Sequence, residues 1–148
     1  MIKIICVGKL KEQYLKDALM EYGKRLSKYS KLEIVELPDY SYDEVKTVLE
    51  EGKKIMSKIK DDDYVITLDI NGKELTSIEF SDFIDKNNSK NMVFVIGGSY
   101  GLSSEVKQRS NYSLSFSRLT FPHQLFRIML LEQIYRGFKI INRESYHK

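Results

Sequence analysis

Short apolar runs alternate with longer amphipathic segments along this sequence, and the alternation limits the fold more than any other feature. Apolar runs predict β-strands at Ile2–Val7, Tyr64–Asp69 and Met92–Ile96, and alternating apolar residues predict strands at Leu32–Leu37 and, more weakly, at Tyr112–Phe116. The remaining segments predict helices at Glu12–Tyr29, Tyr42–Ile59, Ser77–Asp85, Ser103–Gln108 and Pro122–Ile141. Strands that alternate with helices predict an α/β fold with a mostly parallel sheet and helices on both faces. A length of 148 residues fits one domain over residues 1–148.

Individual residues mark where these elements are expected to begin and end. Ser41 is a candidate N-cap for the second helix. The apolar residues of that helix share one stripe, which we expect to face the core: Val45, Val48, Leu49, Ile55, Met56 and Ile59. Asn71-Gly72 predicts a turn after the third strand. Pro122 suits the first position of the last helix.

Three loops that follow strands have a composition suited to ligand binding: Leu68–Gly72, Gly97–Leu102 and Phe116–Phe121. Ligands of open parallel sheets bind beyond the carboxyl ends of the strands. The glycines of the second loop allow close backbone approach to a ligand, although they also fit a tight strand-to-helix turn. Their spacing matches neither a P-loop nor the dinucleotide fingerprint, which would follow the first strand. This disfavours P-loop NTPases, ordinary dinucleotide-binding domains and ordinary Rossmann-type methyltransferases.

The last helix is apolar on more than one side, through Leu125, Ile128, Met129, Leu131, Ile134, Phe138 and Ile141. A helix of this kind is buried on two sides, so we expect the core to cover one side and a partner subunit the other. Glu132 and Arg136 lie four residues apart and predict a solvated surface ion pair. The terminal Tyr146-His147-Lys148 combines an aromatic ring, a titratable base and a cation.

The few cysteines and histidines limit which disulfides and metal sites the chain can form. Cys6 is the only cysteine and lies in an apolar run, which favours a buried core residue and a reducing compartment. His123 and His147 are the only histidines and have no carboxylate at a ligand spacing, so we expect no metal. The sequence starts without a signal-peptide pattern and has no apolar run of about 20 residues. We therefore expect a cytoplasmic protein without a membrane partner.

The charge distribution is uneven although the net charge is only +3. Residues 111–148 carry 6 Lys/Arg and 2 Asp/Glu. This excess fits chance variation of the surface, and it equally fits contact of the last third with an anion such as a nucleic acid or a phosphate.

Several motifs, taken together and in order, resemble the RlmH family of the SPOUT superfamily of methyltransferases. They are Val7-Gly8-Lys9, Tyr22-Gly23-Lys24-Arg25, Leu68-Asp69 with Gly72-Lys73, Phe94–Gly98 with Gly101-Leu102, Leu119–Gln124, Glu132-Gln133 with Tyr135-Arg136, and Tyr146-His147-Lys148. The match runs from Met1 to Lys148. The resemblance implies a C-terminal trefoil knot, a homodimer, and methyl transfer from S-adenosylmethionine to N3 of a pseudouridine in 23S ribosomal RNA within the ribosome.

The resemblance also implies site residues. By motif position the cofactor contacts Leu68, Gly97 and the loop Phe116-Ser117-Arg118-Leu119-Thr120-Phe121, while Gly98 and Gly101 shape the glycine loop. Arg118 enters this set through its backbone alone. His147, with Tyr146 and Arg136, is the candidate catalytic group, reaching the cofactor of the partner subunit. His123 is the second candidate base, and packing at the start of the last helix is at least as good an account of it.

Two other functions remain open. A non-enzymatic RNA-binding protein fits the basic last third, although no RRM, KH or double-stranded RNA-binding signature is present. A nucleotide-sensing domain fits the glycine loop but leaves the Glu132–Arg136 and Tyr146–Lys148 motifs unexplained.

Overall fold

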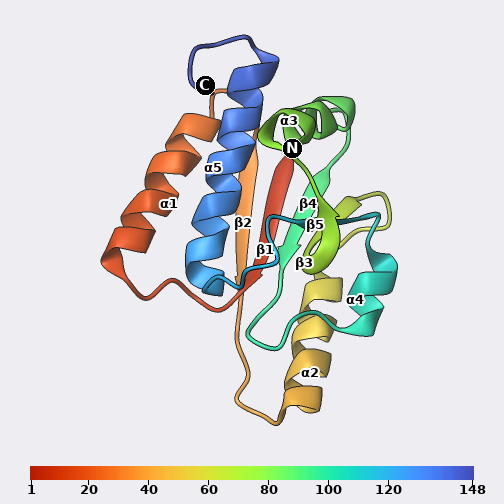
Figure 1. Cartoon of the computed structure of the whole chain (residues 1–148). Coiled ribbons are helices and arrows are strands. Elements are labelled where there is room, and N and C mark those ends of the chain that lie inside the picture. Colours follow the sequence, from red (N-terminus) through yellow and green to blue (C-terminus); the bar gives the residue numbers. More distant parts are fainter.

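The computed structural model describes residues 1–148 as a five-stranded sheet with five helices (Figure 1). The strands are β1 (Ile2–Val7), β2 (Leu32–Leu37), β3 (Tyr64–Glu74), β4 (Met92–Ile96) and β5 (Tyr112–Ser115). The helices are α1 (Gln13–Leu26), α2 (Glu44–Ser57), α3 (Ser77–Lys86), α4 (Ser104–Arg109) and α5 (His123–Ile141). Every predicted strand and helix is present, and β1, β2 and β4 have the predicted bounds.

The sheet has the strand order β2-β1-β4-β3-β5, and all four pairings are parallel. This confirms the predicted α/β class. Phe94 in the central strand pairs with Ile4 on one side and Ile66 on the other. Because all strands run the same way, their carboxyl ends meet at one edge of the sheet, where the predicted loops Gly97–Leu102 and Phe116–Phe121 emerge. Leu68–Gly72, also predicted as a loop, is instead part of β3.

Helices cover both faces of the sheet, as predicted. One face packs Ile4, Cys6 and Phe94 against α1, α3 and α5. The opposite face packs Ile5 and other strand residues against α2 and α4. Figure 1 shows α5 between α1 and α3, with which it makes its main helix contacts. Cys6 is fully buried, which confirms its predicted place in the core.

The prediction for α2 is wrong in its cap and in the first half of its buried face. Asp43, rather than Ser41, caps the helix by accepting a hydrogen bond from the Lys46 N–H. Val45 and Leu49 are 71% and 53% exposed. Ile55 is buried as predicted, and Met56 and Ile59 pack against the same core cluster. Thr47, Glu51 and Gly52 are buried in place of Val45 and Leu49, because their face of the helix packs on the sheet and on α4.

The predicted turn at Asn71-Gly72 does not end β3, which continues to Glu74. The pairing with β5 shifts register between Leu68 and Lys73, so the additional residues form an irregularity within the ladder. A Cβ on Gly72 would lie 2.8 Å from the backbone of Leu114. The glycine is therefore needed for the close approach of β5 to β3 rather than for a turn.

The last helix also departs from its prediction in two respects. Pro122 is the N-cap of α5, and His123 is its first residue. The second apolar side of α5 is covered largely by α1 and α3 of the same chain, so its composition alone does not require a partner subunit. No helix is long and apolar enough to span a membrane.

Candidate functional site

A pocket of about 380 Å³ lies at the carboxyl ends of β3, β4 and β5. The three segments that the sequence singles out, of which Leu68–Gly72 is part of β3, all contribute to its wall. Nine of the ten predicted cofactor contacts line it: Leu68, Gly97, Gly98, Gly101, Phe116, Ser117, Leu119, Thr120 and Phe121. The tenth, Arg118, is exposed and is not among the lining residues. The fold thus brings together segments about 50 residues apart in the chain.

The glycine loop forms a tight turn at the pocket wall. The N–H of Gly101 donates to the carbonyl oxygen of Gly98 at 3.1 Å, and Gly101 has φ +84°, in the left-handed region that favours glycine. A Cβ on Gly97 would lie 2.8 Å from the Leu102 side chain and 3.0 Å from the carbonyl carbon of Gly101. Close packing and the left-handed residue thus explain two of the three glycines, and the turn presents backbone rather than side chains to the pocket.

The loop after β5 supplies apolar surface and backbone polar groups. The ring of Phe116 lies 4.9 Å from that of Phe126 on α5, which fixes one wall. The hydroxyl of Ser117 accepts the N–H of Leu119 at 3.0 Å, and the Ser115 hydroxyl donates to the Ser117 carbonyl at 3.1 Å. This mixture suits a ligand with a flat ring and hydrogen-bonding edges.

Three ionisable side chains line the pocket. Lys107 and Asp69 form an ion pair at 3.7 Å. His123 is half-buried, and its burial, followed by the charges of Arg127 and Lys11, lowers its pKa below the ordinary 6.5, while Asp39 opposes the shift. The imidazole is therefore mainly neutral at pH 7 and able to accept a proton.

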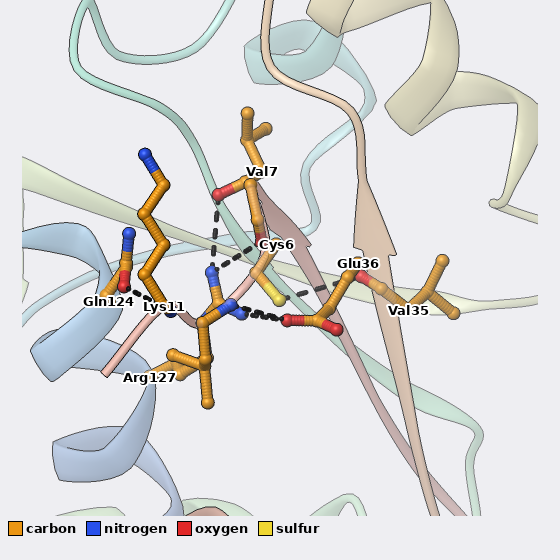
Figure 2. Close-up of polar contacts among 9 residues, drawn as sticks. Cys6, Val7, Lys11, Val35, Glu36, Gln124 and Arg127 are labelled. Atoms are coloured by element: carbon orange, nitrogen blue, oxygen red, sulfur yellow. Dashed lines mark hydrogen bonds and ion pairs between the residues drawn. The ribbon is translucent and has the colours of Figure 1, made fainter. Parts of the chain in front are cut away.

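Arg127 is a residue that the sequence interpretation missed. It is 1% exposed, and its Nη1 lies 2.7 Å from Oε2 of Glu36 on β2. Its Nη2 donates to the carbonyl oxygens of Val7 and Gly8 at 3.3 and 3.0 Å (Figure 2). The guanidinium ties the start of α5 to the carboxyl end of β1. The spacing to His123 was visible in the sequence, but nothing in the sequence indicated burial.

The three predicted catalytic residues lie together beyond the other end of α5. Nη1 of Arg136 is 3.1 Å from Nδ1 of His147, and its guanidinium carbon lies 4.8 Å from the ring centre of Tyr146. Tyr146 packs edge-on against Tyr135 at 5.0 Å between ring centres. Arg136 also pairs with Glu132 at 2.7 Å, with 25% and 19% of the two side chains exposed. The prediction of a solvated pair was therefore wrong, because the tail covers it.

Within one chain this C-terminal cluster, defined as Arg136, Tyr146 and His147, lies apart from the pocket. Thirteen positions of α5 separate His123 from Arg136, which is roughly 20 Å along a helix. Figure 1 shows the chain end at the opposite end of α5 from the helix start. A second cavity of about 430 Å³ shares Phe116, Ser117 and Phe121 with the pocket and extends to Glu132. The cluster lines neither cavity.

No group of three or more His, Cys, Asp or Glu side chains is arranged to hold a metal ion. The donor set at the pocket consists of backbone groups, hydroxyls and rings, which suits an organic ligand better than a cation.

Comparison with known proteins gives a consistent result. A family model described as "Predicted SPOUT methyltransferase" matches residues 1–147. The ribosomal RNA large subunit methyltransferase H of Clostridium tetani (strain Massachusetts / E88) is 57% identical over 157 aligned residues, covering 99% of both chains. The protein of the same name from Clostridium botulinum (strain Alaska E43 / Type E3) has the same identity and coverage. The methyltransferase H 1 of Clostridium perfringens (strain SM101 / Type A) is 54% identical with the same coverage.

Proposed function

The chain belongs to the SPOUT methyltransferase family, and from this premise we propose that it transfers a methyl group from S-adenosylmethionine to N3 of a pseudouridine in 23S ribosomal RNA. Residues 1–148 form a single domain in this proposal, and the segment after β4 forms the trefoil knot of the family. The observation that carries the proposal is the pocket at which the three family segments meet, lined by nine of the ten expected cofactor contacts.

The pocket suits the proposed cofactor. Its volume, about 380 Å³, falls in the range of small-molecule sites. Phe116 and Leu68 offer apolar surface to a purine ring, and the turn at Gly98 offers backbone groups to its edge and to ribose. S-adenosylmethionine, when bound, supplies a methyl group that is already electrophilic. The protein must then position the nucleophile and remove its proton.

The C-terminal cluster has the groups to assist loss of the N3 proton. An arginine only donates, so Nδ1 of His147 accepts from Arg136 and the ring proton lies on Nε2. In this arrangement Nε2–H and the guanidinium can stabilise negative charge that develops on the pyrimidine oxygens. Proton abstraction by His147 requires Arg136 to release Nδ1. His123, which lines the pocket and has a lowered pKa, is the second candidate for the base.

We propose a homodimer in which the tail of one chain completes the pocket of its partner, since the cluster of each chain lies far from its own pocket. Three exposed apolar residues fit the dimer face: Tyr14 at 68%, Leu119 at 71% and Leu125 at 39% exposure. Tyr14 and Leu125 lie in the first turns of α1 and α5. The Lys11 N–H donates to Gln124 Oε1 at 3.2 Å, so these turns are adjacent.

Recognition of the RNA relies on the assembled ribosome, in the cytoplasm where ribosomes work. Basic residues of both subunits would contact phosphates of the RNA. We therefore expect efficient methylation of assembled particles and poor methylation of naked RNA fragments.

The test is mass spectrometry of 23S ribosomal RNA after ribosomes from a strain lacking this methyltransferase are incubated with the protein and S-adenosylmethionine. We expect one added methyl group, on N3 of a pseudouridine. A methyl group on another base or no methyl group would contradict the proposal. Calorimetry separates the rival functions, because an RNA-only binder takes up no S-adenosylmethionine and a sensor binds it without transfer.

A further inference from the structure

Glu51 lies buried beneath the glycine turn of the pocket. Glu51 is only 4% exposed, although it carries a carboxyl group. The other buried residues of α2 are small or apolar. A Cβ on Gly98 would lie 2.8 Å from Oε1 and 3.1 Å from Oε2 of this carboxyl. The Glu51 carboxyl therefore lies against Gly98 in the turn and is not among the residues that line the pocket.

One oxygen of this carboxyl has no partner. Oε1 of Glu51 is buried and makes no hydrogen bond. A buried acceptor without a donor is costly and rare in folded proteins. Burial, and then the charge of Asp39, raises the pKa of Glu51. The raised pKa reflects the same free-energy cost of keeping a charged carboxylate away from water. The free oxygen is thus an acceptor without a donor at the back of the pocket wall.

The neighbouring residue fixes the far end of the same loop. A Cβ on Gly52 would collide with the side chain of Ser103. Ser103 caps α4 by accepting the Val106 N–H at 3.3 Å. Glu51 and Gly52 therefore contact both ends of the segment Gly98–Ser103, and α2 acts as its support.

We propose that Glu51 is a positioning residue of the cofactor site: when the cofactor binds, its free oxygen accepts a backbone N–H of the turn Gly98–Gly101 and holds the turn against the ligand. This inference rests on the proposed function. A hydrogen bond to a carboxylate is among the stronger ones in proteins, so its loss should cost about tenfold or more in cofactor affinity. Glu51 reaches neither the methyl group nor the RNA, so the chemical step should not depend on it.

Calorimetry with S-adenosylhomocysteine on the full-length protein tests this inference. We expect Glu51→Leu, which removes the acceptor, to raise the Kd about tenfold or more. Glu51→Gln keeps a carbonyl oxygen at the same place and should stay within about threefold of wild type. Glu50→Leu, at the neighbouring position, where the side chain is partly exposed and pairs only with Lys53, is the matched control and should bind normally. The kcat at saturating S-adenosylmethionine should stay within about twofold in all three variants.

Hydrogen exchange provides a second measurement. S-adenosylhomocysteine should slow exchange of the amides of residues 97–102 in wild type and in Glu51→Gln, but not in Glu51→Leu. Glu51→Asp moves the carboxyl away from the turn without removing its charge, and it should behave as Glu51→Leu. It serves as the second variant if leucine at this position unfolds α2. Wild-type affinity in Glu51→Leu or Glu51→Asp would overturn the inference alone. Absence of binding by wild type itself would overturn the proposed function together with it.

Discussion

Arg127 on α5 and Glu36 on β2 lie 91 positions apart in the sequence, and their side chains meet at 2.7 Å. The guanidinium is 1% exposed, whereas the carboxylate is 32% exposed. The same guanidinium donates to the carbonyl of Gly8, where β1 ends. This contact fixes the start of α5 at the edge of the sheet that carries the pocket, and with it the position of His123.

Replacing Arg127 with methionine should destabilise the protein by about 2–4 kcal/mol. The change leaves a partly buried carboxylate and two strand-end carbonyls without their donor, and removing one partner of such a network is among the costly substitutions. Urea unfolding gives the free energy of unfolding. Glu36→Gln is the control, because its amide oxygen can still accept from Arg127 and from the Leu10 N–H. If the free energy of unfolding falls equally little in both variants, the network does not stabilise the fold.

The sequence predicted the strands better than it predicted which helix faces are buried. The bounds of β1 and β4 follow from apolar runs, because central strands of a parallel sheet are buried on both faces. The bounds of β2, an edge strand, follow from its alternating residues and from Pro38 after it. Val45 and Leu49 were expected in the core and are exposed, since the face of α2 was chosen by packing on α4. Arg127 was not expected in the core, because its burial depends on a carboxylate and two carbonyls that only the fold brings together.

Cys6 should make the protein less stable at alkaline pH. Burial raises the pKa of its thiol from 9.0 to about 11. Between these values the unfolded chain binds fewer protons than the folded chain, so the free energy of unfolding falls as pH rises, by up to about 1.4 kcal/mol per pH unit. Below about pH 9 the effect vanishes. Urea unfolding of wild type and Cys6→Ala at pH 8, 9 and 10 measures the difference, and parallel pH curves for the two proteins would contradict it.

Gly72→Ala should weaken both the β3–β5 pairing and the pocket. The new methyl group would meet the Leu114 backbone at 2.8 Å, and a strand backbone cannot yield without moving the ladder. We expect a loss of about 2–3 kcal/mol in stability, with weaker S-adenosylhomocysteine binding, because Leu114 is in the pocket wall. Gly101→Ala is the comparison: its methyl group meets open space, and only the positive φ costs about 1 kcal/mol. Equal losses in the two variants would show that steric contact is not the cause.

The position of the candidate site could be predicted from the sequence. Whether one chain supplies both the pocket and the catalytic groups could not. Gly97, Phe116 and the other loop residues follow strand ends, and a parallel sheet gathers strand ends at one edge. The distance between this pocket and His147 depends on the direction of α5, which no local pattern encodes. The contacts predicted for the cofactor and the catalytic roles remain predictions.

His123 can be separated from His147 by the pH dependence of methyl transfer. A base must be neutral, so with His123 as the base the rate should fall as pH drops through the pKa of His123, which burial places below 6.5. His123→Asn should then lose most activity at all pH values, while His147→Asn keeps the acid limb at the same position. Single-turnover methylation of ribosomes from pH 5 to 8 measures this. An acid limb that disappears in His147→Asn would assign the base to the tail instead.

Mixed dimers test whether the tail acts on the partner chain. His147→Ala leaves the pocket intact, and Thr120→Trp fills the pocket from an exposed position that lines it. Each variant alone should be nearly inactive. In an equal mixture that exchanges subunits at random, about half of the dimers contain one chain of each kind, and each such dimer has one site with an intact pocket and an intact partner tail. We therefore expect about a quarter of wild-type activity per chain. If the tail served its own pocket, every site would carry a defect and the mixture would stay inactive.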